Sequence, residues 1–500
     1  FFFLLFVSLT PIQTFEPMTP FTVLLTVALY VALLFTVAWR AGRRADNAAF
    51  FTGGRRIRWY WVALAMIGAP MSGVTFVSVP GSVAADGFTY MQMVAGFTIG
   101  QLIVAYVLVP TFYRLKVVSL YEYLDRRFGI RTHRTGAAFF LLSKTVLSAL
   151  KLYVVCIVLQ QLVCTPLGIP FAANAVLTVL FVWGYTRRGG VRSVVWTDVL
   201  QTLCLLAALV SALVAIPRAL DTSLPALLGD VVRSPYARIL VLDDPLSVRS
   251  FGKMFVAGIF ILVAMTGLDQ DMMQRNLSCP TARDSQRNIL LTALCQAVVI
   301  QLLLMLGAML YLYADAAGLT LPDKGDGVFA AVAVHGGLPL IVGILFVLGL
   351  VSSTYSTAGS ALTALTTSSI YDFAHDVRRR DEKSLRQLRH RVHALLAVAI
   401  AALIFLFEYG AGDSVINLVY RVVGFTYGPI LGLFAFGMAT RIPIRERWVP
   451  AVCLLAPAAS ALLQEVLLRW TGYAIGFELI LYNALFTIIG LLIIQKRNEK

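Results

Sequence analysis

The sequence is poor in charge: only 13% of its 500 residues are Asp, Glu, Lys or Arg, whereas 59% are hydrophobic. A chain with a mean hydropathy of +0.81 has too little polar surface to cover a soluble globule. The ten-residue alternation that marks a membrane barrel is missing as well. Instead, apolar segments long enough to cross a hydrocarbon core as helices follow one another along the chain. We therefore expect an all-α integral membrane protein with about thirteen transmembrane helices.

Residues that carry enzyme chemistry are also few. The six cysteines lie mostly in apolar segments without CxxC or metal-ligand spacing, which is typical of small buried side chains. The five histidines form no HExxH motif. Because a membrane enzyme needs a nucleophile, a metal cluster or an acid–base pair, we expect neither enzymatic activity nor an organic cofactor.

The net charge of +15 comes from arginines that cluster in short loops rather than along one face. This distribution favours the positive-inside rule over nucleic-acid binding. The basic loops span residues 39–58, 113–134, 186–192, 376–391 and 441–447. We expect them to be cytoplasmic, which places the N terminus outside and the C terminus inside a cell (inner) membrane.

The apolar segments predict helices near residues 21–40, 59–80, 88–113, 135–164, 168–186, 193–217, 251–276, 289–314, 336–370, 392–409, 414–437, 448–469 and 473–495. Apart from the first helix, five spans enter from the cytoplasm and the next five enter from outside, which is the topology of an inverted repeat. The predicted division is an N-terminal segment with the extra helix and first loop (1–58), a first five-helix repeat (59–217), an external loop (218–250), a second repeat (251–437) and two C-terminal helices with a tail (438–500).

The first helix of each half contains residues that break helices. Pro70 removes a backbone donor in IGAPMSG (67–73), and Gly267 weakens the helix in MTGLDQ (265–270). Either feature alone is common in membrane helices. Their matching positions favour two broken helices, beside which transporters of this topology bind solute and ion.

A hydroxyl-rich stretch, LVSSTYSTAGSALTALTTSSIYDF, occupies residues 350–373. Its Ser and Thr residues form one helical stripe, made of Ser352, Ser356, Ser360, Thr363 and Thr367. Small residues of this kind let helices pack closely, and that interpretation explains most such stripes.

The start of the stripe also suits a sodium ion. The Gly349 carbonyl is followed at i+3 and i+4 by the hydroxyls of Ser352 and Ser353 on the same face. A small, hard ion that must be released in each cycle is suited by neutral oxygens. The broken partner helix offers further carbonyls at Gly68 and Met71, on either side of Pro70.

Six blocks now point to a known family: FFTGGRRIRWYW, PTFYRLKVVSLYEYLDRRFG, GGVRSVVWTDVLQ, GLDQDMMQRNLS, VSSTYSTAGSALTALTTSSIYDF and GFTYGPILGLFAFGM. Their order resembles that of the sodium/solute symporter family over residues 21–437. The resemblance implies the inverted-repeat fold of leucine and galactose symporters, with alternating access driven by a Na+ gradient. It places the conserved sodium site on the carbonyls of Gly68, Met71 and Gly349 and the hydroxyls of Ser352 and Ser353.

The resemblance also implies a possible second sodium site, because Asp198 matches an acid and Ser356 a hydroxyl of some members. Tyr355 departs from the pattern, since a serine is expected there. An intramembrane carboxylate is expensive without a partner, which favours a functional Asp198. The alternative is a structural pairing with Arg187, Arg188 or Arg192.

Sugar symporters of the family resemble one another at positions that here hold Val94, Leu262 and Met265. Sugar hydroxyls would find few partners among these side chains, which disfavours a hexose. The segments VPTFYRLKVVSLYEYLDRRF and SVPG look more like the branch that moves monocarboxylates, iodide and vitamins.

Two intramembrane cations sharpen this prediction. Lys151 and Arg421 each cost free energy in a helix unless they are paired or face water, so a carboxylate substrate is a natural partner for either. The alternatives are snorkelling or internal pairing, with Glu408, Asp413 or Glu465 as candidate partners. Lys144, nearer the cytoplasm, is expected to snorkel.

The substrate cavity is expected beside the break in the first helix. Candidate polar contacts are Ser72, Thr75, Gln92 and Thr266, although each could instead cap broken backbone. Met265 and Phe76 are candidates for an apolar wall, with core packing as the alternative. For Asp269, a structural role that ties its helix to neighbours is favoured over substrate contact.

We therefore predict a Na+-coupled secondary active symporter that imports a small organic solute, most simply an anion such as a monocarboxylate. Symport of a neutral solute, such as a sugar, an amino acid or a vitamin, is the alternative. A membrane sensor and a channel are alternatives from other classes, and the tail that ends at Lys500 leaves no room for a signalling module.

Overall fold

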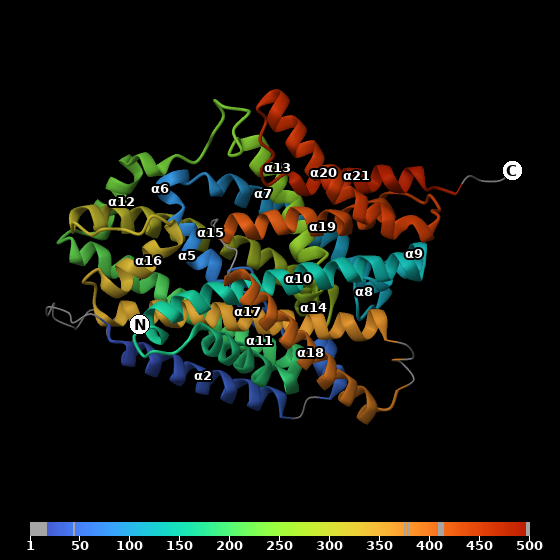
Figure 1. The fold of residues 1–500 in the computed structure, drawn as a ribbon, viewed down its shortest axis with the longest axis horizontal. Coiled ribbons are helices and arrows are strands. Elements are labelled where there is room, and N and C mark those ends of the chain that lie inside the picture. Colours follow the sequence, from blue (N-terminus) through green and yellow to red (C-terminus); the bar gives the residue numbers. More distant parts are fainter. Residues whose placement is uncertain (1–17, 44–45, 375–376, 378–379, 409–414, 497–500) are drawn as a thin grey trace.

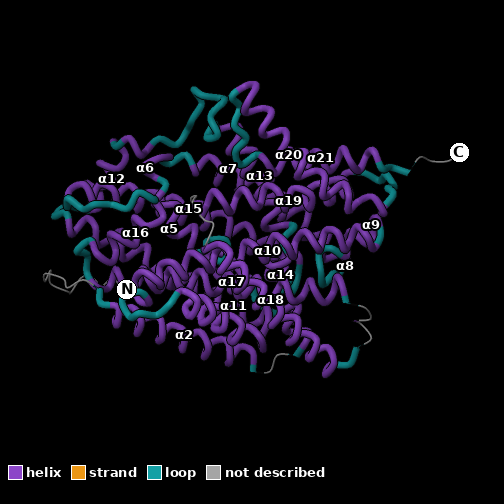
Figure 2. Tube along the Cα trace, viewed as in Figure 1, coloured by secondary structure: helices purple, strands orange, loops and turns teal. Residues whose placement is uncertain are grey.

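The computed structural model describes residues 18–43, 46–374, 377, 380–408 and 415–496. In these ranges the regular elements are helices, which run side by side in one bundle (Figures 1 and 2). The only β-type pairing among the described residues is a single bridge between Ile444 and Gln495. The all-α fold predicted from the apolar segments is confirmed.

The long helices follow the predicted order. They are α2 (Pro20–Gly42), α7 (Tyr90–Ile103) continuing into α8 (Val109–Leu115), α10 (Ile130–Leu159), α11 (Phe171–Ala219), α15 (Ala282–Ala316), α17 (Leu340–Phe373), α18 (Glu382–Glu408), α19 (Val415–Ala439), α20 (Val449–Thr471) and α21 (Leu479–Ile493). Short helices connect them: α3 (Asn47–Thr52), α6 (Val83–Asp86), α9 (Glu122–Phe128), α12 (Leu224–Arg233) and α16 (Val328–Ala330).

Within the described ranges, 9 helices are long and apolar enough to cross a membrane, or 11 if each bent pair counts as one span. The predicted thirteen spans are compatible with this count. The difference arises because α21 has only 15 residues, and because α11 runs through two predicted spans with a kink at Gly190, whose φ is 51°.

Both predicted helix breaks are present. The first separates α4 (Trp59–Gly68) from α5 (Gly73–Gly81) by 51°, and the second separates α13 (Phe251–Leu262) and its extension to Gly267 from α14 (Gln270–Asn276) by 70°. After the second break, the carboxylate of Asp269 accepts hydrogen bonds from the backbone N–H groups of Asp271 (2.8 Å) and Met272 (3.3 Å). This cap satisfies donors that the break would otherwise leave unpaired.

The hydroxyl-rich helix α17 lies at the centre of the bundle and packs against α10 and α11 (Figure 1). In its C-terminal half, Thr363, Thr366 and Thr367 donate to carbonyls four residues earlier, at 2.7 to 3.0 Å. Tyr185 of α11 donates to the Tyr355 carbonyl at 2.6 Å beside Gly359, where any side chain would collide with the tyrosine. This half of the stripe is a close-packing seam, as its small residues predicted.

Candidate functional site

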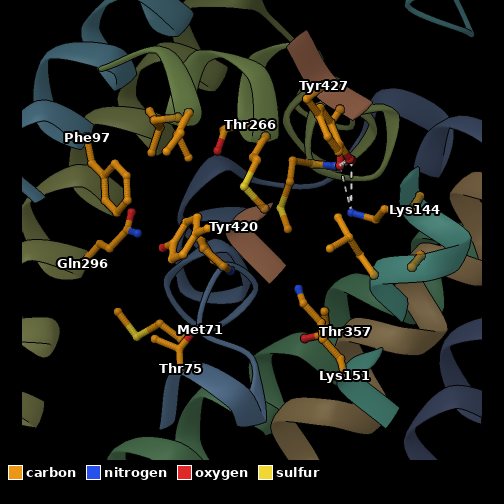
Figure 3. Close-up of a pocket in the computed structure, with 18 of the residues that line it drawn as sticks. Met71, Thr75, Phe97, Lys144, Lys151, Thr266, Gln296, Thr357, Tyr420 and Tyr427 are labelled. Atoms are coloured by element: carbon orange, nitrogen blue, oxygen red, sulfur yellow. Dashed lines mark hydrogen bonds and ion pairs between the residues drawn. The ribbon is translucent and has the colours of Figure 1, made fainter. Parts of the chain in front are cut away.

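A cavity of about 90 Å³ lies beside the first helix break (Figure 3). It is bounded by α5, α7, α10, the broken α13–α14 helix, α15, α17 and α19. Five residues predicted from the sequence as ion or substrate contacts line it: Met71, Thr75, Lys151, Met265 and Thr266. The residues missed by the sequence reasoning include Phe97, Gln296, Thr357, Tyr420 and Tyr427.

Two lysines of α10 face this cavity, and they differ in their partners. Lys144 is buried, and its ammonium contacts Asp269 at 2.9 Å and Asp271 at 2.8 Å. The expectation that Lys144 snorkels is therefore wrong, because these two acids hold its charge inside the bundle. Lys151 points toward the centre of the cavity (Figure 3), and among the described residues no carboxylate lies at ion-pair distance from it.

The ion pairs continue from the cavity to α11. Arg275 is fully buried and contacts Asp271 at 3.2 Å and Asp198 at 2.8 Å. Asp198 thus has a buried cationic partner, Arg275, whereas the alternative interpretation of this acid named arginines of the segment 186–192. The physical reason is the 70° bend, which turns α14 into the core and presents Asp271 and Arg275 one helical turn apart. Ser356 of α17 donates its hydroxyl to the other oxygen of Asp198.

Asp269 ties three helices together, α10, α14 and α19, as the sequence favoured. Besides capping α14, it contacts Lys144 of α10 and accepts a hydrogen bond from the hydroxyl of Tyr427 on α19 at 2.5 Å. Both of its oxygens therefore have partners inside the protein.

Polar atoms of three elements surround the first break. Gln201 of α11 donates from its amide nitrogen to the carbonyls of Gly68 at 2.9 Å and Met71 at 3.3 Å. On α17, the hydroxyls of Ser352 and Ser353 donate to the carbonyls of Gly349 at 3.2 Å and Leu350 at 3.0 Å. Gln201 was missed, although an amide three residues after Asp198 in an apolar helix was a visible signal.

The second half of the first broken helix, α5, packs closely against the hydroxyl-rich helix α17. A methyl group placed on Gly73 would collide with the Thr354 hydroxyl, and one placed on Gly349 would lie 3.2 Å from the Phe76 ring. Among the described residues, the side-chain oxygens of Gln201 and Thr354 are buried without a hydrogen-bond partner. Buried oxygens of this kind are costly unless something donates to them or a cation binds them.

A second, outer cavity of about 430 Å³ lies beyond the first and contains Arg421, Arg249 and Asp86. Tyr90 and Tyr420 line both cavities, and their hydroxyls are 2.6 Å apart. The tyrosine pair therefore forms the partition between the inner and the outer cavity.

Three predicted substrate contacts lie elsewhere. Arg421 is exposed in the outer cavity, because it lies in the second turn of α19, close to the end of that helix. Gln92 binds the segment 218–250: its amide donates to the Arg249 carbonyl at 2.9 Å and accepts from Val241 N–H at 3.0 Å. Ser72 is buried at the start of α5, outside the cavity lining.

Phe76, a candidate for the cavity wall, packs in the core between Phe329 and Phe346, at 5.1 and 5.9 Å between ring centres. Of the candidate partners for the intramembrane cations, Asp413 lies outside the described residues. Glu465 pairs with Arg469 on its own helix at 2.5 Å.

Comparison with solved structures shows the fold. The chain is similar to a Na+-coupled sialic acid symporter in a substrate-bound outward-open state, with a TM-score of 0.79 and 19% identity over 94% of this chain and 97% of the other. It is also similar to a nucleobase-cation-symport-1 family transporter in a closed conformation, with a TM-score of 0.54 and 16% identity over 90% of this chain and 94% of the other.

Curated relatives match most of the chain. The human sodium/iodide cotransporter is 27% identical over 84% of this chain and 65% of its own length. Sodium-coupled monocarboxylate transporter 1 of Xenopus laevis is 24% identical over 84% of this chain and 67% of its own length. The sodium-dependent multivitamin transporter of Oryctolagus cuniculus is 25% identical over 84% and 65%. The chain thus spans about two thirds of the length of these relatives.

A sequence model of the sodium:solute symporter family matches residues 50–441. That range contains both helix breaks, the buried ion pairs and the cavity between them. By this match the chain belongs to the sodium:solute symporter family, whose members are transporters rather than enzymes.

Proposed function

We propose that this protein is a Na+-coupled symporter that imports a small organic anion, such as a monocarboxylate, by alternating access across a cell membrane. The observation that carries the anion is Lys151. It points into the inner cavity, and no described carboxylate pairs with it, whereas the neighbouring Lys144 has two acid partners. An ammonium at this depth favours a ligand that brings a negative charge.

The formal charges of the buried cluster support an anion that arrives together with a cation. The cluster contains the cations Lys144, Lys151 and Arg275 and the acids Asp198, Asp269 and Asp271, so its charges cancel. One Na+ bound without an anion would leave an uncompensated charge in a low-dielectric interior. One Na+ with one monovalent anion restores the balance.

For Na+ we propose the oxygens around the first break: the carbonyls of Gly68, Met71 and Gly349 and the hydroxyls of Ser352 and Ser353. Gln201 is added because it contacts two of these carbonyls and keeps an unpaired buried oxygen. The two serine hydroxyls can bind the ion through their own lone pairs while they donate to the carbonyls of α17. The Gln201 amide nitrogen, in contrast, must release the carbonyls of Gly68 and Met71 to which it now donates. Binding would thereby exchange these hydrogen bonds for contacts to Na+ and fix the angle between α4 and α5.

We propose a second Na+ site at Asp198 and Ser356 only for a conformation in which Arg275 has moved away from Asp198. In the described structure Arg275 and the Ser356 hydroxyl occupy the two oxygens of Asp198. A Na+ ion at this acid would have to displace the guanidinium, which also contacts Asp271. The two sites would then be linked through the buried ion pairs.

The transport cycle begins with Na+ at the break, followed by the anion at Lys151. The tyrosine pair of Tyr90 and Tyr420 serves as the outer gate, because it separates the cavity that holds the solute from the outer cavity. Coupling requires that Na+ bind more tightly to the outward-facing state. The moving bodies are a four-helix bundle and a scaffold, which rock against each other, and the predicted five-plus-five repeat, with its boundaries at residues 59–217 and 251–437, supplies the helices of both.

Relatives that carry iodide, monocarboxylates and vitamins in their names support a small solute and favour an anion. A neutral solute, such as a sugar or an amino acid, is the second candidate, and the polar groups of Thr75, Thr266 and Gln296 in the cavity wall favour it. A screen of Na+-dependent thermal stabilisation over carboxylates, sugars, amino acids and vitamins separates the two. Stabilisation by a sugar alone would reject the anion.

The sodium assignment is tested by uptake into proteoliposomes as the Na+ concentration is varied. In the double variant Ser352→Ala/Ser353→Ala we expect the Na+ dependence to disappear or the half-saturating Na+ concentration to rise at least about 10-fold, because two ligands are lost. Thr363→Ala is the matched control: its hydroxyl also donates within α17, at 3.0 Å, but in the packing seam. If uptake by the double variant stays fully Na+-dependent, the assignment of Ser352 and Ser353 to the sodium site is wrong.

A further inference from the structure

A third cavity, of about 520 Å³, lies away from the transport path at the ends of two peripheral helices. It is formed where α2 ends and α18 begins, together with the segment around Asn47. Four of its lining residues are basic: Arg43, Lys383, Arg386 and Arg389. None of them belongs to the two cavities along the transport path.

Arg389 places a buried, fixed guanidinium in the wall of this cavity. Only 4% of the residue is exposed, and its guanidinium lies over the Phe50 ring at 4.2 Å. One terminal nitrogen donates to the Asn47 side-chain oxygen at 2.8 Å. Among the described residues no acceptor bonds the buried Nε of Arg389. A buried guanidinium with an unused donor favours an anionic acceptor.

The remaining charges leave the cavity positive. Its two acids are Asp46 and Glu382, against four cations. Glu382 already accepts from the backbone N–H of Asn47 at 3.4 Å and from its side-chain amide. Arg386 and Lys383 are exposed at the mouth of the cavity, so a ligand meets their charges first.

The surroundings identify the ligand as part of the membrane. Both α2 and α18 are apolar enough to span it, and most of their surface is exposed on the outside of the bundle. Trp39, half-exposed at the cavity wall, is a residue type typical of the membrane–water boundary. Along α18 the exposed surface continues with Leu395 and Val398, which are 70% and 66% exposed. A headgroup in the cavity would therefore have apolar surface beside it for its acyl chains.

We propose that this cavity binds the phosphodiester headgroup of an anionic membrane phospholipid. The phosphate oxygens would accept from Arg389 and Arg386, with Lys383 and Arg43 supplying further positive charge. The site would pin α2 and α18, two helices that otherwise contact lipid over most of their length, to the rest of the bundle. It is independent of the identity of the transported solute.

The test measures lipid retention and stabilisation by the full chain. The protein purified in a neutral detergent is titrated with phosphatidylglycerol or, separately, phosphatidylcholine, and bound lipid is counted by native mass spectrometry while melting temperature is followed. The variant is Lys383→Gln/Arg386→Gln, whose two side chains are exposed. The control, Arg114→Gln/Arg126→Gln, removes the same charge from exposed positions outside the cavity.

We expect wild type and control to retain phosphatidylglycerol and to melt higher with it, and the variant to need at least about 5-fold more lipid for the same effect. Millimolar inorganic phosphate should neither displace the lipid nor replace its stabilisation. The proposal is overturned if the variant retains phosphatidylglycerol as the control does, if phosphatidylcholine acts equally, or if inorganic phosphate substitutes for the lipid.

Discussion

The buried charges show most directly what single residues contribute to the site. Lys144 and Lys151 lie two helical turns apart on α10, yet within the described part of the chain only Lys144 has acids at ion-pair distance. An intramembrane ammonium without an internal partner is retained for a ligand or for water. The different partners of the two lysines therefore separate a cation that is paired inside the bundle from the cation proposed to bind solute, which helix position alone did not.

Replacing Lys151 by methionine tests this distinction. Because a hydrogen bond to a charged group contributes about 1.5–3 kcal/mol, Lys151→Met should raise the KM for an anionic solute at least about 10-fold. Initial rates of labelled-solute uptake at saturating Na+ measure the change. Lys151→Arg, which keeps the charge, should recover part of the affinity.

Lys324→Met, at an exposed loop position, is the matched control and should leave KM unchanged. An unaltered KM in Lys151→Met, with an intact protein, would show that the solute does not use this ammonium. Uptake of a neutral solute would be expected in that case.

Asp271 is the residue that joins the two halves of the ionic cluster, since it contacts both Lys144 and Arg275. Asp271→Asn leaves two buried cations with one fewer acid, and loss of one partner from a buried pair costs about 3–5 kcal/mol. We expect a clearly lower melting temperature in detergent. Asp230→Asn, at an exposed position, is the control, and equal melting of both variants would mean that the cluster does not stabilise the fold.

At the scale of elements, the two broken helices were predictable and their consequences were not. Pro70 and Gly267 disrupt helices by local chemistry that a sequence displays directly. The contacts between Lys144 and Asp269, 125 positions apart, depend instead on the 70° bend that turns α14 into the core. A sequence shows that a helix breaks but does not show in which direction its second half then runs.

The same limit explains the positions of individual side chains. Thr75, Met265 and Thr266 line the inner cavity because they sit at the breaks themselves. Gln92 and Arg421 lie near the N-terminal ends of their helices, and their depth depends on where the segment 218–250 folds over α7 and α19. The sequence predicts where each residue lies along its helix. It does not predict which cavity the residue lines or how deep in the bundle it lies.

The pair of Tyr90 on α7 and Tyr420 on α19 offers a test of the outer gate. A hydrogen bond contributes about 0.5–1.5 kcal/mol net, so Tyr420→Phe should raise the open population about 2- to 10-fold. The readout is the rate at which a membrane-impermeant thiol reagent labels Thr266→Cys in the inner cavity from outside.

The comparison variant is Tyr123→Phe, whose side chain lies outside both cavities and should leave the labelling rate unchanged. If Tyr420→Phe labels no faster than Tyr123→Phe, the tyrosine hydrogen bond does not hold the gate closed, and the partition must be maintained by packing alone.

At the scale of the whole molecule, the distribution of charge predicts how the bundle is oriented in the membrane. The loop 376–391 has seven Lys or Arg residues against three acids, whereas 218–250 has four of each sign. Basic residues near an anionic cytoplasmic leaflet contribute about 1 kcal/mol each. The first loop should therefore stay in the cytoplasm, and the second should lie outside.

Cysteine labelling of whole cells tests this orientation with two exposed positions, Leu242→Cys and Lys383→Cys. We expect a membrane-impermeant maleimide to label Leu242→Cys in intact cells and Lys383→Cys only after permeabilisation, with the parent protein as the background. Labelling of Lys383→Cys in intact cells would show that the orientation is the reverse of the predicted one. In that case the cavity with Arg421 would open to the cytoplasm, and the tyrosine pair would become an inner gate, so the direction of the proposed cycle depends on this measurement.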